Sequence, residues 1–190
     1  MQRQWGLFAS ALTLLLSAGL AATPASYVKA DNDEGGSIVG SWIGPLSLDN
    51  SPIPITELPS FSRGGTVAGT NTFSHNCQNP SLPPVLAVEI SDYFGSWAPM
   101  VGSNQIAITI KRLLFACANT PVGIYGPSFP GQNVGLLSIQ AVGTIQHTKD
   151  GDTLTGPVTF QLTNLFNQVV FAGSGTASLT RVTIEPLATP

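Results

Sequence analysis

Apolar and polar residues alternate in three long runs near the end of the chain, within residues 133–184. Two segments of turn composition separate the runs, Lys149-Asp150-Gly151-Asp152 and Asn164-Leu165-Phe166-Asn167. Asp-Gly between alternating runs is a strong hairpin signal, because both central residues of a type I′ turn need a positive φ. The pattern therefore predicts a long antiparallel meander, against which the earlier segments must pair or close.

The same alternation marks further strands before the meander. Ile106, Ile108 and Ile110 alternate with less apolar residues, which gives a period of two rather than the 3.6 of a helix. Strands that follow one another with regular turn spacing predict an all-β fold, an antiparallel up-and-down closed barrel of about eight strands, whose closure removes exposed edges. The expected strands span residues 38–48, 57–63, 66–73, 94–101, 105–118, 133–148, 153–163 and 168–184.

Three segments do not read as ordinary strands. Residues 52–59 contain three prolines, which lack the backbone donor of a sheet ladder, so we expect a loop or an edge rather than a central strand. Residues 85–90 fit a short strand and a single helical turn equally well. Residues 119–132 form a long loop rich in Pro and Gly. We expect residues 119–132 or 52–60 to form the mouth of the barrel.

The first 30 residues have the order of a secretory signal peptide. Arg3 supplies a positive start, an apolar run follows, and Val28-Lys29-Ala30 offers small residues at a cleavage site. A retained membrane anchor is the alternative, but the apolar run is short for a bilayer and no basic flank follows. We therefore expect a single β-barrel domain over residues 31–190, secreted or periplasmic, with no membrane span after removal of the signal.

Charge limits the class of partner. If cleavage follows Ala30, the mature chain keeps five basic residues against ten acidic ones, a net charge of −5. Nucleic acid and anionic membranes both need a basic face, so neither is expected as the main partner. The sequence predicts no oligomeric state.

The chain has two cysteines, Cys77 and Cys117. In an exported protein a disulfide between them is the default interpretation, and two separate thiols are the alternative. The bridge would close a loop of about 40 residues and stabilise the fold by roughly 3–4 kcal/mol. Its role would be structural, since the chain has no Cys-x-x-Cys motif.

Few residues suggest catalysis or metal binding. His75 lies two residues before Cys77, but this pair supplies only two of the ligands that a metal needs, so we predict no metal site and no cofactor. Glu89 stands near an aromatic cluster, and a carboxyl buried against aromatic rings can act as a general acid. No catalytic residue is predicted beyond this alternative, in which the barrel would be a cyclase or isomerase.

The first and last strands carry a paired signature. Gly40-Ser41-Trp42 opens the barrel and Thr180-Arg181-Val182 ends it. This arrangement resembles the lipocalin-like (calycin) barrel superfamily. The resemblance implies that Trp42 closes one end of the barrel with Arg181 packed over it, and that a small hydrophobic molecule binds at the opposite, open end.

The alternation of apolar and polar residues also predicts which side chains line the interior of the barrel. Lys111 and Arg112 are adjacent, so one of them is expected to face inward, where an arginine could hold a carboxylate; a position at the barrel rim is the alternative.

We expect an exported, non-catalytic protein that binds a small hydrophobic molecule. A filled barrel that acts through its loops, as an inhibitor or surface interaction protein, is a further alternative, and a cavity of several hundred Å³ would argue against it. The lining candidates are Ile108, Ile110, Arg112, Leu137, Ile139, Val158 and Phe160.

Overall fold

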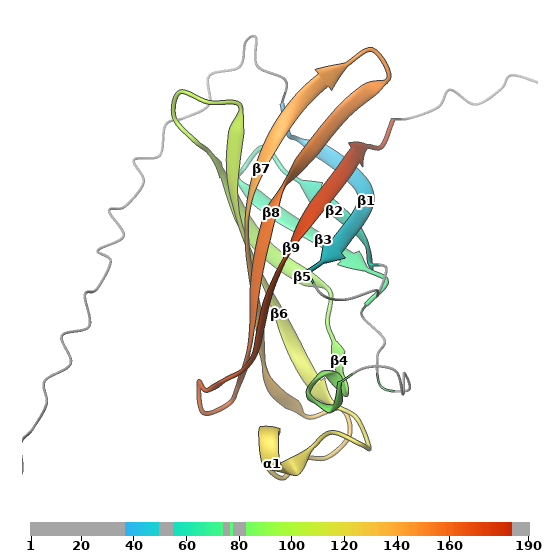
Figure 1. Ribbon diagram of the computed structural model, residues 1–190, viewed down its shortest axis with the longest axis vertical. Coiled ribbons are helices and arrows are strands. Elements are labelled where there is room, and N and C mark those ends of the chain that lie inside the picture. Colours follow the sequence, from blue (N-terminus) through green and yellow to red (C-terminus); the bar gives the residue numbers. More distant parts are fainter. Residues whose placement is uncertain (1–36, 50–54, 74–76, 78–82, 184–190) are drawn as a thin grey trace, which may run out of the picture.

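The computed structural model describes residues 37–49, 55–73, 77 and 83–183 of the 190-residue chain. The predicted signal peptide, residues 1–30, lies outside the described residues. Nine strands, one 3₁₀ turn and one short helix make up the described part of the chain (Figure 1). They are β1 (Gly40–Leu48), β2 (Ile55–Phe61), β3 (Thr66–Asn71), η1 (Pro84–Leu86), β4 (Val88–Ile90), β5 (Tyr93–Pro99), β6 (Gln105–Ala116), α1 (Val122–Tyr125), β7 (Asn133–Thr148), β8 (Gly151–Asn164) and β9 (Val169–Arg181).

The sheet closes on itself. Its strands follow the order β6-β5-β3-β2-β1-β9-β8-β7, and β7 pairs back with β6. Every pair is antiparallel, so the result is a closed eight-stranded antiparallel barrel, to which β4 adds by pairing with the end of β6. The predicted fold class is confirmed. Among the described residues, no helix is both long enough and apolar enough to cross a membrane.

The expectation that residues 52–59 exclude a central strand is wrong for residues 55–59. These residues belong to β2, which pairs with β1 on one side and β3 on the other. The paired register with β1 is interrupted at Leu58 and Pro59, opposite Ile43 and Trp42. The missing donor of Pro59 therefore coincides with a break in the ladder, where its absence costs little.

The sequence of residues 85–90 fitted a short strand and a single helical turn equally well. The structure contains both, over residues 84–90. The 3₁₀ turn η1 comes first, and the three-residue strand β4 follows it. The loop 119–132 folds under one end of the barrel, where α1 lies (Figure 1). It is anchored there by Tyr125, which is buried and donates its hydroxyl hydrogen to the carbonyl of Val85 at 2.6 Å.

Trp42 and Arg181 seal one end of the barrel. The indole of Trp42 is fully buried and donates to the carbonyl of Ile38 at 2.8 Å. The guanidinium carbon of Arg181 lies 4.8 Å from the indole centroid, close enough for a cation–π contact. Gly40 has a φ of +134°, a conformation that residues with a Cβ rarely adopt, so the glycine of the Gly-Ser-Trp signature is required by the backbone.

Asp152 completes this sealed end, a role that its place in a turn did not suggest. Its Oδ2 lies 2.8 Å from Nε of Arg181, and its Oδ1 lies 2.6 Å from Nδ1 of His147. The hydrogen bond with His147, together with the charge of Arg181, holds the pKa of the Asp152 carboxyl below its ordinary value. The carboxylate therefore fixes Arg181 over Trp42 from the outer side.

We expect Asp152→Asn to lower the free energy of unfolding by about 1 kcal/mol at pH 7. A carboxyl whose pKa is lowered in the folded state stabilises the fold above its unfolded pKa and loses that contribution as the pH falls through its folded pKa. The deficit should therefore shrink as the pH falls below about 4. Urea denaturation at pH 7, 5 and 3.5 measures it. Asp150→Asn, an exposed position in the same turn, is the matched control, and an equal deficit at all three pH values would contradict this role of Asp152.

Cys77 and Cys117 form a disulfide, as predicted, with Cα atoms 5.4 Å apart and 40 residues between them in sequence. The bridge ties residue 77, in the segment after β3, to the end of β6. A disulfide fits an extracellular or periplasmic protein, because the cytosol of most organisms keeps thiols reduced.

Candidate ligand pocket

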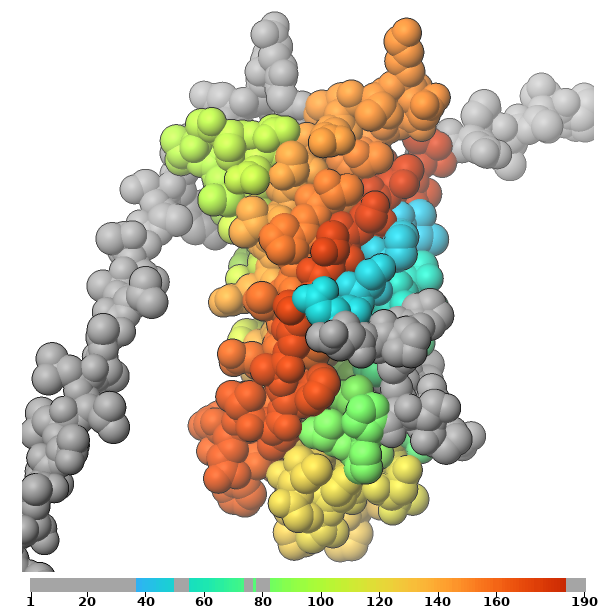
Figure 2. Space-filling model, in the orientation of Figure 1, coloured from blue at the N-terminus to red at the C-terminus, as the bar shows by residue number. Residues whose placement is uncertain are grey.

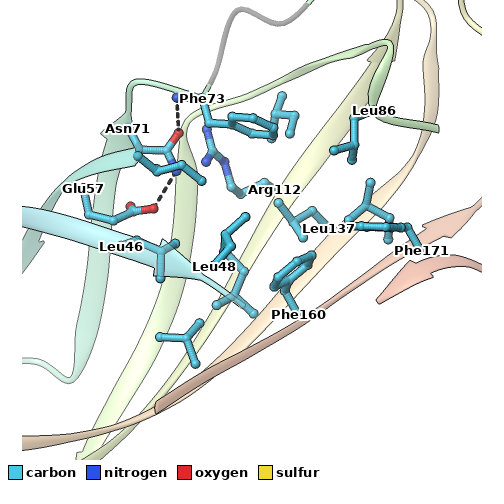
Figure 3. A pocket seen from close by; sticks show the side chains of 15 residues that line it. Leu46, Leu48, Glu57, Asn71, Phe73, Leu86, Arg112, Leu137, Phe160 and Phe171 are labelled. Atoms are coloured by element: carbon cyan, nitrogen blue, oxygen red, sulfur yellow. Dashed lines mark hydrogen bonds between the residues drawn. The ribbon is translucent and has the colours of Figure 1, made fainter. Parts of the chain in front are cut away.

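A pocket of about 50 Å³ lies inside the barrel (Figure 3), toward the end away from Trp42, as the lining residues on β1 show. Trp42 stands at the start of β1, whereas Leu46 and Leu48, which line the pocket, stand at its end. The described residues that line it are Leu46, Leu48, Ile55, Glu57, Asn71, Phe73, Leu86, Ile90, Arg112, Leu137, Ile139, Val158, Phe160, Leu162 and Phe171.

The size of the pocket limits what it encloses. A volume of about 50 Å³ corresponds to roughly three or four water molecules. This is well below the several hundred Å³ expected of a barrel that surrounds a whole drug-sized ligand. The pocket as it stands takes a very small molecule, or one slender end of a larger one.

Five of the seven predicted lining residues surround the pocket: Arg112, Leu137, Ile139, Val158 and Phe160. The other two do not. Ile108 belongs to the core cluster at the sealed end, together with Trp42, and Ile110 packs against that cluster. Both face inward like Arg112, but they lie earlier on β6, at a different height in the barrel.

Arg112 is the inward member of the Lys111-Arg112 pair. Its side chain is 2% exposed, whereas Lys111 is exposed on the outer face and donates to Ser138. Nε of Arg112 donates to the carbonyl of Ser91 at 2.6 Å, and the guanidinium carbon lies 5.5 Å from the centroid of the Tyr93 ring. Burial lowers the pKa of Arg112, and the charge of Glu57 opposes this effect. Arg112 therefore stands in the interior wall, and the alternative of a position at the barrel rim does not hold.

Glu57 faces the same pocket from β2, and sequence reasoning missed it. Its Oε1 accepts a hydrogen bond from Nδ2 of Asn71 at 2.7 Å (Figure 3). Burial raises the pKa of Glu57, while the bond from Asn71 and the charge of Arg112 act in the opposite direction. The signal was present in the sequence, since Glu57 opens the strand expected at residues 57–63 and shares the parity of Ile55 and Phe61, which are buried.

Glu89, the first candidate of the enzyme hypothesis, does not line the pocket. It lies on β4 between Val88 and Ile90, which are both buried, so it faces the other side of the strand. Glu57 is the carboxyl that meets the apolar lining instead. Within the described residues no group of three or more metal-ligating side chains comes together. Cys77 is in the disulfide, and His75 lies outside the described residues.

The end of the barrel beneath the pocket carries exposed apolar side chains and no charge in two of its segments. The segments 119–132 and 164–169 contain no charged residue. They meet where Nδ2 of Asn164 donates to the carbonyl of Ile124 at 3.1 Å, and both lie at the α1 end of the molecule (Figures 1 and 2). We call this surface the apolar tip; its exposed large apolar residues are Val122, Phe129, Leu165, Phe166 and Val169.

The fold and the pocket together define a class: a closed eight-stranded antiparallel barrel, sealed at one end by a tryptophan under an arginine, with a small apolar pocket in its other half. Comparison of the chain with protein-family models, with curated proteins and with solved structures finds no match.

Proposed function

We propose that this protein is an exported, non-catalytic, calycin-like barrel that binds a small apolar molecule, or the apolar end of a slender one. The observation that carries the proposal is the pocket itself, an apolar hollow whose lining also includes Glu57, Asn71 and Arg112 (Figure 3). Binding sites for small molecules have this composition: mostly apolar walls, which supply affinity, and a few polar groups, which fix orientation.

The position of the pocket supports the calycin-like part of the proposal. The resemblance implies a plug of Trp42 and Arg181 at one end and a ligand at the other. The cation–π contact of this pair and the location of the pocket at the opposite end of β1 agree with that arrangement. The disulfide supports export, because such bonds persist in oxidising compartments.

The proposal is tested with 1-hexanol, whose slender chain can enter the pocket by one end, and methyl-labelled protein observed by NMR. We expect titration to shift the methyl signals of Leu46, Leu137 and Leu162, which line the pocket, and not that of Leu179 at the sealed end. Val158→Phe puts a ring into the hollow and should weaken binding at least tenfold. Overpacking costs about 1–3 kcal/mol, so folding of the variant is checked by its NMR spectrum.

The matched control is Val101→Phe, the same substitution at a position that is 86% exposed, which should leave the affinity unchanged. If Val158→Phe does not fold, Leu48→Phe replaces it, because Leu48 is only partly buried. Shifts spread over the surface, or equal binding by the blocked and control variants, would reject the interior site.

A further inference from the structure

We propose that the pocket takes the unsubstituted, methyl-terminated end of a straight alkyl chain, and that the polar group of the ligand stays outside the pocket. This inference rests on the proposed function and adds to it the class of the ligand and the direction in which it enters. It differs from the expectation that an inward arginine holds a carboxylate, because Arg112 and the polar side chains near it are already engaged by the protein.

Glu57 and Asn71, two of the polar side chains in the pocket wall, are bonded to protein groups. Nδ2 of Asn71 donates to Oε1 of Glu57 at 2.7 Å, and Oδ1 of Asn71 accepts from the backbone N–H of Phe73 at 3.1 Å (Figure 3). The hydroxyl of Tyr93 donates a further hydrogen bond to the Glu57 carboxyl. Both polar ends of the Asn71 amide therefore have a partner, and the carboxyl of Glu57 accepts from two side chains.

Arg112, the third polar side chain of the wall, is engaged in the same way. Its Nε donates to the carbonyl of Ser91 at 2.6 Å, and its guanidinium lies over the ring of Tyr93. Gly69 allows Tyr93 to reach this cluster, because a Cβ at position 69 would lie 2.7 Å from the tyrosine hydroxyl oxygen. Side chains of β2, β3, β5 and β6 thus form one cluster, and the hydrogen bonds that the structure shows run within the protein rather than toward a ligand.

A polar group of the ligand therefore gains little inside the pocket. A hydroxyl or carbonyl that leaves water without finding a new partner is destabilised, and an ionised group is destabilised more. A methyl group has no hydrogen bond to lose, and its transfer from water to an apolar wall is favourable. The apolar part of the wall includes Leu46, Leu137, Ile139, Val158 and Leu162. The polar end of the ligand consequently stays in water, and the methyl end enters.

The volume of the pocket selects a chain over a ring. A cavity that admits benzene measures about 150 Å³, whereas this pocket measures about 50 Å³. A straight alkyl chain is narrower than a ring with the same number of carbons. It can place its last few carbons in the pocket while the rest of the molecule lies outside.

The first test asks which end of 1-hexanol is inside. The protein is deuterated except at its methyl groups, and nuclear Overhauser effects between these groups and the bound alcohol are recorded. We expect effects between the terminal methyl group of 1-hexanol and the pocket residues Leu137 and Leu162, and none from the CH₂ group that carries the hydroxyl. Effects from that CH₂ group to the same leucines would overturn the inference, while the proposed function would stand.

The second test compares matched probes at equal concentrations. 1,2-Hexanediol keeps a methyl end and 1,6-hexanediol does not, so the first should bind at least about tenfold more tightly. Cyclohexanol has as many carbons as 1-hexanol but closes them into a ring, and it should bind at least about tenfold more weakly than 1-hexanol. The inference would be overturned if 1,6-hexanediol shifts the pocket methyl signals as strongly as 1,2-hexanediol, or cyclohexanol as strongly as 1-hexanol.

The blocked and control variants show whether these effects arise in the pocket. Val158→Phe, or Leu48→Phe if that variant does not fold, should abolish the Overhauser effects and the preference for 1,2-hexanediol. Val101→Phe should keep both. A preference that persists in the blocked variant would arise elsewhere on the protein and would overturn the inference. Failure of 1-hexanol to shift the pocket methyl signals of the unaltered protein would reject the proposed function and this inference with it.

Discussion

Removal of the disulfide is expected to lower the free energy of unfolding by about 4 kcal/mol. The bond joins Cys77 to Cys117, 40 residues apart in sequence, and opening a loop of this length returns its entropy to the unfolded chain. Cys117 is buried directly after β6, whose last residue, Ala116, pairs with Val88 of β4. Urea denaturation of Cys77→Ala/Cys117→Ala against the unaltered protein measures the loss.

A reductant supplies the control for this prediction. Dithiothreitol should destabilise the unaltered protein to the level of the double variant and leave the double variant unaffected. A loss below about 1 kcal/mol would contradict the entropic account and would mean that the unbridged unfolded chain already keeps these two segments close together.

Arg112→Met is expected to lower the free energy of unfolding by about 3 kcal/mol. Methionine keeps a long unbranched chain but removes the donor to the carbonyl of Ser91 and the positive charge that acts on Glu57. Loss of one member of a buried pair of charges is costly, because the other stays buried without compensation. The free energy of unfolding in urea at pH 7 tests the prediction.

A double-mutant cycle separates the charge from the packing. Glu57→Gln combined with Arg112→Met should recover about 1–2 kcal/mol relative to the sum of the two single changes, since the uncompensated carboxylate is then absent. Lys111→Met, the same substitution one residue earlier on the exposed face of β6, should stay within about 0.5 kcal/mol of the unaltered protein. Strict additivity in the cycle would show that Glu57 and Arg112 do not interact.

The strands were predictable because alternation and turn chemistry agree over most of the chain. Residues 133–148 were predicted as one strand and form β7 with those bounds, and the Asp-Gly turn that follows leads directly into β8. The errors fall where the preference of a single residue, such as proline, competes with the pairing of neighbouring strands. Proline excluded residues 55–59 from the central sheet, yet β2 forms there because its missing donor falls at a gap in the ladder with β1.

The pocket was only partly predictable, for a geometric reason. The alternation of apolar and polar residues predicts which side chains point into the barrel. It does not predict how far along the barrel axis each of them lies. Ile108, Ile110 and Arg112 share one face of β6, yet only Arg112 reaches the pocket. The partner Glu57 comes from a strand far away in sequence, and its position follows from the register of closure rather than from its own neighbours.

The apolar tip has a consequence for how this end of the molecule responds to solution conditions. Mobile ions weaken attraction only between charged groups, and segments 119–132 and 164–169 offer none. A contact made through Phe129 and Phe166 would therefore keep its strength from dilute buffer to sea-water salinity. Sulfate, which is excluded from apolar surfaces, would tighten such a contact rather than loosen it.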